Sequence, residues 1–253
     1  MKLCRFEHAG AVQYGILEGD AVEVLSAPPF ERIEKAGRRV PLADVRLLTP
    51  TDPGKIVGVG LNYRAHAEEM KKPVPEQPLL FLKPPTAALD PERPIVLPRI
   101  SGEVHYEAEL AVVIGRRCRR VSPEEAREAI LGYTCFVDVT ARDIQRREIQ
   151  YTRAKGCDTF APFGPVIATG LDPRNLQVTG RVNGAVRQNG RTSDMIFDVY
   201  SLVSFVSQGM TLLPGDVLTT GTPPGVGPLA PGDLLEIEIE GVGVLRNPIV
   251  AEE

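Results

Sequence analysis

The chain has 253 residues, of which 43% are hydrophobic and 25% charged, so it can bury a substantial core without disulfide bonds. Its net charge of −4 argues against a nucleic-acid partner attracted by bulk electrostatics, and four cysteines without a Cys-x-x-Cys pair are poor material for a zinc site. No apolar run approaches the ~18 residues that a membrane span needs, and the charged N-terminus lacks the apolar stretch of a signal peptide. We therefore expect a cytoplasmic protein with no membrane or nucleic-acid partner.

Short alternating strands are predicted at the N-terminus, over residues 3–6, 12–17 and 21–25, with glycine-containing turns between them. A stretch that contains prolines and arginines, residues 27–50, then leads away from this small meander. We expect a minor N-terminal β-rich domain over residues 1–48 and the main domain over residues 49–253.

The main domain opens with a buried type of strand over residues 55–60. Asn62 is a good N-cap for a short helix that follows, from Tyr63 to Met70. His66 and Glu69 are three residues apart on this helix and are therefore neighbours. Such a carboxylate can orient an imidazole and make it a general base, although pairs at this spacing also occur as plain surface residues. The position of the pair just after a glycine-rich strand end favours the functional interpretation.

A further strand is predicted over residues 79–82, and a longer one over residues 105–114. In the longer strand Glu107 and Glu109 point to the same face, since side chains alternate along a strand. Two like charges on one partly buried face repel each other, and desolvation adds to the cost. An exposed strand end, basic partners or a bound cation would each relieve the repulsion.

The position of Asp138 favours the third of these explanations, a bound cation. A capping box of Ser122 and Glu125 predicts a helix over residues 123–131, and a strand over residues 133–137 then ends at Asp138. Together with Glu107 and Glu109, Asp138 supplies three carboxylates and no soft ligand, which is typical of a hard-cation site with open positions. Mg²⁺ is the first choice, Mn²⁺ the second, and Ca²⁺ a weaker substitute because no Asp-rich loop is present.

The segment after Asp138 predicts a binding site for an organic carboxylate. Thr140 and Asp143 fit a capping box, so a helix should begin beside the metal ligand with Arg142 and Gln145 on one side. A helix N-terminus, a guanidinium and an amide suit a carboxylate, although Arg142 and Gln145 could also be ordinary surface residues. Lys155 follows this helix and could pair with substrate oxygens.

Strands and turns dominate the C-terminal third, with one amphipathic helix over residues 199–210. Two Pro-Gly-Asp turns, at residues 214–216 and 231–233, each precede a strand. The glycine-rich segment over residues 219–227 lacks the lysine of a nucleotide-binding P-loop, so we expect it to present the Thr222 hydroxyl to a small anion. The whole pattern predicts an α+β chain that is mostly β.

Several segments in this order resemble the fumarylacetoacetate hydrolase family, above all its short bacterial and acylpyruvase-type members. They are Gly60–Glu69, Phe81–Pro84, Tyr106–Leu110, Asp138–Gln145, Pro214–Asp216 and Thr220–Gly227. The resemblance extends over about residues 55–248, and the preceding segment is similar to the small N-terminal domain of these proteins.

The resemblance implies a mixed β-sandwich roll with a small N-terminal β-rich domain, assembled as a homodimer. It implies Mg²⁺ or Mn²⁺ bound by Glu107, Glu109 and Asp138. The catalytic His–Glu dyad of the family corresponds to His66 and Glu69, carried on a lid, with Lys155 as a further catalytic group. The substrate-binding groups correspond to Arg142, Gln145, Lys155 and Thr222, and less directly to Lys83.

We therefore expect a metal-dependent enzyme that acts on a small 2-oxo or 2,4-dioxo acid through a metal-stabilised enolate. Hydrolysis of a C–C bond in an acylpyruvate ranks first. The alternatives are isomerisation of a 2-hydroxyhepta-2,4-diene-1,7-dioate or 5-carboxymethyl-2-hydroxymuconate type of substrate, as in aromatic catabolism, and decarboxylation, for example of oxaloacetate. A metal-stabilised binding or scaffold protein is the non-enzymatic alternative.

Overall fold

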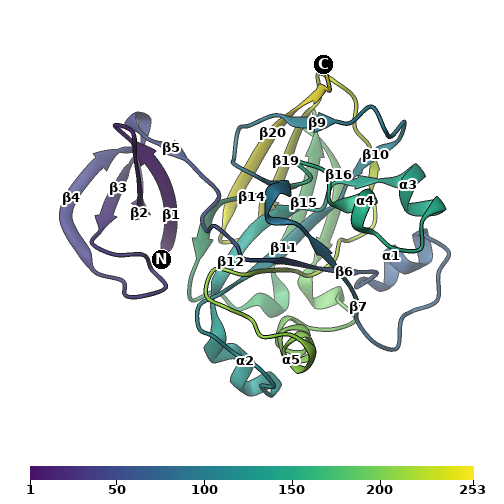
Figure 1. The fold of residues 1–253 in the computed structure, drawn as a ribbon, viewed down its shortest axis with the longest axis horizontal. Helices are drawn as coiled ribbons and strands as arrows, with labels where there is room; N and C mark the ends of the chain where they lie inside the picture. Colours follow the sequence, from purple (N-terminus) through teal and green to yellow (C-terminus); the bar gives the residue numbers. More distant parts are fainter.

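The computed structural model describes residues 1–253, and strands make up most of its regular structure (Figure 1). The strands are β1 (Lys2–His8), β2 (Ala11–Glu18), β3 (Ala21–Leu25), β4 (Lys35–Pro41), β5 (Arg46–Leu47), β6 (Ile56–Gly60), β7 (Leu79–Lys83), β8 (Ala88–Leu89), β9 (Ile95–Leu97), β10 (Val104–Tyr106), β11 (Ala108–Ile114), β12 (Ile130–Val137), β13 (Thr140–Ala141), β14 (Ala161–Ala168), β15 (Gln177–Val182), β16 (Ala185–Arg191), β17 (Val217–Thr219), β18 (Gly227–Pro228), β19 (Leu234–Ile239) and β20 (Gly243–Ala251). The helices are α1 (Arg64–Glu69), α2 (Pro123–Ala129), α3 (Arg142–Arg147), α4 (Thr152–Lys155) and α5 (Val199–Gly209). The predicted α+β, mostly β fold class is confirmed.

Two sheets form the sandwich of the main domain. The larger sheet runs in the order β4-β3-β2-β1-β14-β12-β11-β17-β6-β7, and the smaller in the order β16-β15-β19-β20-β9. Strands β11, β12 and β14 of the larger sheet lie against β15, β19 and β20 of the smaller one. The buried side chains between them belong to one large apolar cluster, which includes Leu110, Val112, Val178 and Ile237.

Strand β11 is covered on both faces. Ala108, Leu110, Val112 and Ile114 point into the main apolar cluster, whereas Ala111 and Val113 belong to two smaller clusters on the other side. This arrangement agrees with the apolar residues that the sequence places on both sides of the strand. The expected single strand over residues 105–114 is nevertheless wrong, because it breaks at Glu107. The first part, β10, pairs with β13 and β18 in a separate small sheet.

The N-terminal strands β1 to β4 form an antiparallel meander at one end of the molecule (Figure 1). Residues 27–50, which contain prolines and arginines, do not simply lead away from the meander. They include its edge strand, β4, in which only Val40 is buried. Strand β1 also pairs with β14, through Lys2 opposite Ala168, so the meander continues the larger sheet. The division at residues 48 and 49 stays a prediction.

Helices α2 and α5 pack against each other (Figure 1). The predicted capping box at the start of α2 is confirmed, since the Ser122 side chain accepts from the Glu125 amide and the Glu125 side chain accepts from the Ser122 amide. Helix α5 buries Val199, Leu202 and Val203, as its apolar spacing predicts. None of the helices combines the length and the apolar character needed to cross a membrane.

Candidate active site

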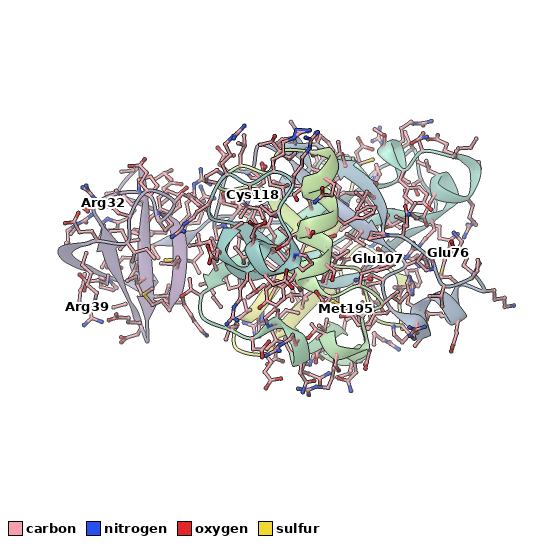
Figure 2. The ribbon with its side chains drawn as sticks, turned by 90° about the horizontal axis from the view of Figure 1, so that it is seen from below. Arg32, Arg39, Glu76, Glu107, Cys118 and Met195 are labelled. Atoms are coloured by element: carbon pink, nitrogen blue, oxygen red, sulfur yellow. The ribbon has the colours of Figure 1, made fainter.

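The strand order brings residues that are distant in the sequence to the neighbouring ends of two interior strands of the larger sheet, β11 and β12. Strand β11 begins at Ala108, which lies opposite Val137, the last residue of β12. Glu107 and Asp138 are therefore adjacent, and the Asp138 amide donates to the Glu107 carbonyl oxygen at 3.0 Å. In the view of Figure 2, Glu107 lies toward the end of the molecule that carries Glu76, far from Arg32 and Arg39 of the N-terminal meander.

Glu107, Glu109 and Asp138 are all buried, and one ligand atom from each lies within 4.8 Å of the others. Burial and the neighbouring Asp138 and Glu107 carboxylates raise the pKa of Glu109. Glu109 Oε2 accepts from the Gly221 amide at 2.9 Å, but the ion pairs of the other two acids with lysine and arginine do not extend to Glu109. Three buried hard oxygen donors, one of them without a cationic partner, fit a divalent cation such as Mg²⁺ or Mn²⁺.

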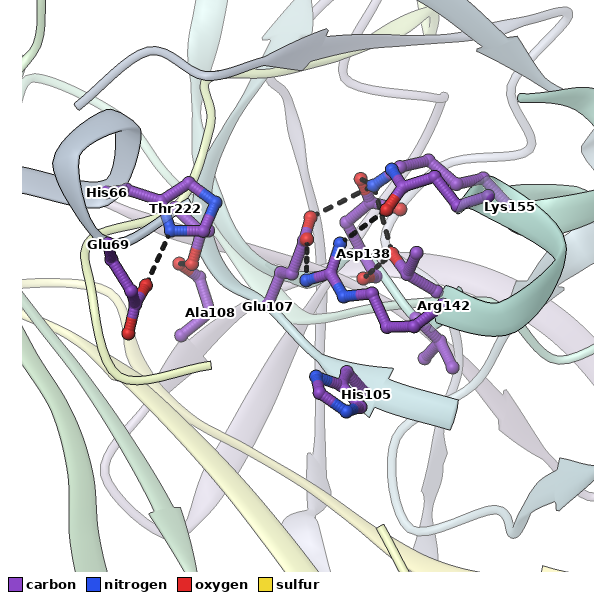
Figure 3. Close-up of polar contacts among 12 residues, drawn as sticks. His66, Glu69, His105, Glu107, Ala108, Asp138, Arg142, Lys155 and Thr222 are labelled. Carbon is purple, nitrogen blue, oxygen red and sulfur yellow. Dashed lines mark hydrogen bonds and ion pairs between the residues drawn. The ribbon is translucent and has the colours of Figure 1, made fainter. Parts of the chain in front are cut away.

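Three buried basic residues, Lys83, Arg142 and Lys155, pair with Glu107 or Asp138. Figure 3 shows Arg142 and Lys155 beside these carboxylates. Lys155 Nζ lies 2.9 Å from Glu107 Oε2 and 2.9 Å from Thr140 Oγ1, and it also pairs with Asp138. Burial opposes the charge of this ammonium, but the Asp138 and Glu107 carboxylates outweigh it and raise the pKa of Lys155. The Arg142 guanidinium pairs with Glu107.

Lys83, the weakest of the sequence-based candidates, is completely buried. Its Nζ pairs with Asp138 and donates to the Val139 carbonyl oxygen at 3.2 Å. Burial lowers the pKa of Lys83, against the opposing effect of Asp138. Lys83 is not among the residues that line the cavity described below, so in this structure its role is to pair with Asp138.

His66 and Glu69 form the predicted pair. His66 is buried, and its Nδ1 lies 2.8 Å from Glu69 Oε2 (Figure 3). The other oxygen, Glu69 Oε1, accepts from the Gly225 amide at 2.9 Å, which connects α1 to the glycine-rich loop after β17. With Nδ1 engaged by the carboxylate, Nε2 is the nitrogen left to exchange a proton with a ligand.

The expected N-cap of α1 is wrong. Tyr63 occupies that position without a side-chain bond. Asn62 is instead buried, where it donates to the carbonyl oxygens of Phe197 and Thr220 and accepts from the Phe197 amide. These long-range bonds fix the strand end that precedes the His66 helix. A Cβ on Gly221 would lie 2.7 Å from the Asn62 Cβ, so glycine allows this contact.

Helix α3 begins at Arg142, close to the predicted start, but without the expected capping box. Ala141 is the N-cap, the Thr140 hydroxyl donates to the Asp138 carbonyl oxygen at 3.1 Å, and Asp143 accepts from Ser101. Arg142 Nη1 donates to Gln145 Oε1 at 2.8 Å, so these two side chains do lie together. This bond leaves the Gln145 amide NH₂ group as a donor for a ligand.

Thr222 and Gln188 connect the glycine-rich loop to Ala108, the first residue of β11. The Thr222 hydroxyl donates to the Ala108 carbonyl oxygen at 2.9 Å and accepts from Gln188 Nε2 at 2.8 Å. Its proton is therefore already used, which leaves only acceptor capacity for a ligand. Gln188 also accepts from the Ala108 amide at 2.9 Å. The sequence analysis missed Gln188, and its position in a polar strand gives no local signal for this role.

One cavity joins most of these groups. Its volume is about 30 Å³, well below the ~300–1,000 Å³ that is usual for small-molecule sites. Its lining residues are Val59, Gly60, Leu61, His66, Met70, Lys72, Leu79, Glu107, Glu109, Arg142, Gln145, Tyr151, Lys155 and Thr222. Figure 3 shows His66 on one side of Glu107, and Arg142 and Lys155 on the other. Most of the predicted site residues thus line one small, highly charged space, and Glu69 and Asp138 contact residues that line it.

Comparison with known proteins gives the same family that the motifs suggest. The family model described as fumarylacetoacetate (FAA) hydrolase C-terminal matches residues 55–250, and the model described as Rv2993c-like, N-terminal matches residues 1–50. The human mitochondrial oxaloacetate tautomerase FAHD2A is 42% identical over 224 residues, which cover 83% of this chain and 71% of the relative.

Two solved mycobacterial structures are similar over the whole chain. The 5-carboxymethyl-2-hydroxymuconate delta-isomerase from Mycobacterium smegmatis is 47% identical with a TM-score of 0.94, and the match covers 100% of both chains. The 2-hydroxyhepta-2,4-diene-1,7-dioate isomerase from Mycobacterium marinum is 46% identical with a TM-score of 0.93, covering 100% of this chain and 99% of that one. On this evidence the chain belongs to the fumarylacetoacetate hydrolase family.

Proposed function

We propose that this protein moves a proton at the carbon next to the 2-oxo group of a small 2-oxo acid, and so interconverts keto and enol forms or shifts a double bond. The proposal depends on one observation. His66, bonded to the Glu69 carboxylate, lines the same cavity as a cluster of acidic and basic side chains. The resemblance to proteins named as isomerases and as an oxaloacetate tautomerase supports the same chemistry.

Glu107, Glu109 and Asp138 would hold the divalent cation. When bound there, Mg²⁺ or Mn²⁺ would act as a Lewis acid that stabilises negative charge on the substrate's 2-oxo oxygen. The formal charges of the six buried ionisable groups at this site cancel, because the three acids are matched by Lys83, Arg142 and Lys155. A dication therefore leaves two positive charges, which match the carboxylate and the enolate oxygen of a 2-oxo acid.

The chain's own residues would bind the carboxylate and move the proton. The Gln145 amide and a remaining N–H of Arg142 line the cavity as donors for the carboxylate. The three N–H groups of Lys155 already bond to Glu107, Asp138 and Thr140, so Lys155 would contribute its positive charge to the site. His66 Nε2 accepts the proton while Glu69, bonded to Nδ1, stabilises the resulting imidazolium. The same histidine can then return the proton to oxygen or to another carbon.

Hydrolysis of a C–C bond in an acylpyruvate is the second candidate, and the one that the motifs alone rank first. It would use His66 to activate water instead of removing a proton from carbon, and the hydrolase name of the family favours it. Decarboxylation of a β-keto acid would use the same carboxylate-binding groups. The small cavity and the isomerase and tautomerase relatives favour proton transfer.

The test is a set of assays in Mg²⁺. Ultraviolet absorbance follows the keto–enol change of oxaloacetate and double-bond shifts in 2-hydroxydienoates, coupling to lactate dehydrogenase detects pyruvate from acylpyruvates, and a further assay detects carbon dioxide. We expect His66→Gln to reduce proton transfer by about 10²- to 10⁴-fold with an unchanged melting temperature. His8→Gln is the matched control, because His8 belongs to the N-terminal meander.

Three outcomes would contradict the proposal. Full keto–enol activity in His66→Gln would remove the histidine from the mechanism. Release of pyruvate from an acylpyruvate without any isomerisation would establish the hydrolase. If Mg²⁺ raised the melting temperature but the protein turned over no 2-oxo acid, the binding or scaffold alternative would hold.

A further inference from the structure

We propose that Gln188 is a positioning residue, which holds the glycine-rich loop of residues 219–227 against β11 and so aligns the acidic cluster with the histidine–glutamate pair. This inference rests on the proposed function, because it concerns how the same site is held in place. Gln188 is the only buried residue of β16, with 1% of its surface exposed. A buried amide in an otherwise exposed strand needs hydrogen-bond partners, and the partners of Gln188 all belong to the site.

The side-chain amide of Gln188 joins the loop to the first residue of β11. Its Nε2 donates to Thr222 Oγ1 at 2.8 Å and to the Pro223 carbonyl oxygen at 2.7 Å, while its Oε1 accepts from the Ala108 amide at 2.9 Å. The Pro223 carbonyl can only accept and the Ala108 amide can only donate, so these partners fix which way the amide points. Both of its N–H groups are used, so Gln188 has no donor left for a ligand and acts by holding other residues.

Two glycines make room for this contact. Gly180 of β15 pairs with Gln188, and a Cβ there would lie 3.3 Å from Gln188 Oε1 and 3.3 Å from the Ala108 Cβ. Gly190 lies two residues further along β16, and a Cβ there would lie 2.6 Å from the Pro223 Cβ. A side chain at either position would press on the amide or on the loop. The strands around Gln188 are therefore shaped to let the loop approach closely.

The loop that Gln188 holds contacts both halves of the site. The Gly221 amide donates to Glu109 Oε2, and the Gly225 amide donates to Glu69 Oε1, both at 2.9 Å. Gln188 bonds to the segment between these two amides, so a shift of the loop away from it would disturb both contacts together. Removing a hydrogen-bond partner that orients metal ligands typically costs about 10- to 100-fold in metal affinity or activity.

Two glutamines of one hairpin provide matched variants. Gln177 of β15 also makes three side-chain hydrogen bonds, all to residues of β16 that do not line the cavity. Gln188→Met and Gln177→Met each remove three hydrogen bonds and keep a side chain of similar length. Isothermal titration would measure the dissociation constant of Mg²⁺ for both variants and the unaltered protein. Hydrogen–deuterium exchange would measure the protection of residues 219–227 in the metal-free proteins, and the keto–enol assay would give kcat and KM.

We expect Gln188→Met to raise the Mg²⁺ dissociation constant about tenfold and to speed exchange in residues 219–227. At saturating Mg²⁺ its kcat should fall about tenfold with little change in KM, because Arg142 and Gln145, which would bind the carboxylate, do not belong to the loop. Gln177→Met should change none of these quantities. If Gln188→Met behaves like Gln177→Met, the inference is overturned while the proposed function stands.

A second variant decides the matter if Gln188→Met does not fold. Thr222→Val keeps the volume of the side chain but removes the hydroxyl that connects Gln188 to the Ala108 carbonyl oxygen. Faster exchange of residues 219–227 in metal-free Thr222→Val would support the inference, and unchanged exchange would overturn it. If the unaltered protein turns over no 2-oxo acid, the proposed function fails, and the Mg²⁺ affinity and the exchange rates still judge Gln188.

Discussion

Replacing Gly225 with alanine should disturb the His66–Glu69 pair without touching either side chain. Gly225 has φ of +100°, and a Cβ added there would lie 2.1 Å from the Arg187 carbonyl oxygen. Because that oxygen belongs to the backbone of β16, it cannot rotate out of the way, and the loop must move. The Gly225 amide donates to Glu69 Oε1 at 2.9 Å, so this movement would also break the bond that ties the loop to the pair.

The expected cost has three parts. A side chain at this φ costs about 1–3 kcal/mol, and forcing a methyl group into close-packed backbone costs about 1–3 kcal/mol more. Loss of the hydrogen bond to Glu69 adds about 1 kcal/mol. This value is low for a bond to a charged group because the Glu69 side chain is 34% exposed. We therefore expect the free energy of unfolding to fall by about 3–7 kcal/mol.

Gly232→Ala is the matched control. Gly232 has a similar φ of +93°, but a Cβ there would meet no heavy atom within 4 Å, so only the backbone cost of about 1–3 kcal/mol should appear. Urea unfolding followed by circular dichroism compares the two variants, and the keto–enol assay measures activity at a temperature where both are folded. Equal loss of stability in the two variants, with full activity in Gly225→Ala, would refute this reasoning.

Further predictions concern the buried charges. Lys83→Met removes a fully buried partner of Asp138 and should lower the free energy of unfolding by about 3–5 kcal/mol in urea titrations. Lys55→Met should cost clearly less, because the Lys55 side chain beside Asp216 is 24% exposed, and equal losses would contradict the argument. The raised pKa of Glu109 contributes stability at low pH that is lost as pH rises through the folded-state pKa. In EDTA, melting curves from acid to alkaline pH should therefore show a smaller decline for Glu109→Gln than for the unaltered protein. Added Mg²⁺ should stabilise the unaltered protein by about 2.7 kcal/mol at 100 times its dissociation constant, and a similar gain in Glu109→Gln would exclude Glu109 as a ligand.

Features that depend on local periodicity could be predicted from the order of the residues alone. The spacing of His66 and Glu69 on a helix places them within reach of each other, and the structure has them in contact. Glu107 and Glu109 lie near one another as predicted, although Glu107 falls at the break between β10 and β11. The apolar spacing of α5 gives its buried face. The capping box of α2 formed as predicted because both of its partners lie within one turn of helix.

Which of the local preferences prevailed depended on contacts between segments that are far apart in the chain. Asn62 and Thr140 each have a side chain suited to capping the next helix, but both are buried and bond to remote or turn backbone instead. The partnership of Lys83 with Asp138 and that of Gln188 with Ala108 join segments far apart in the chain. Such contacts follow from strand order and register, which local patterns do not contain, because a buried polar group bonds to whichever partner the packed chain brings to it.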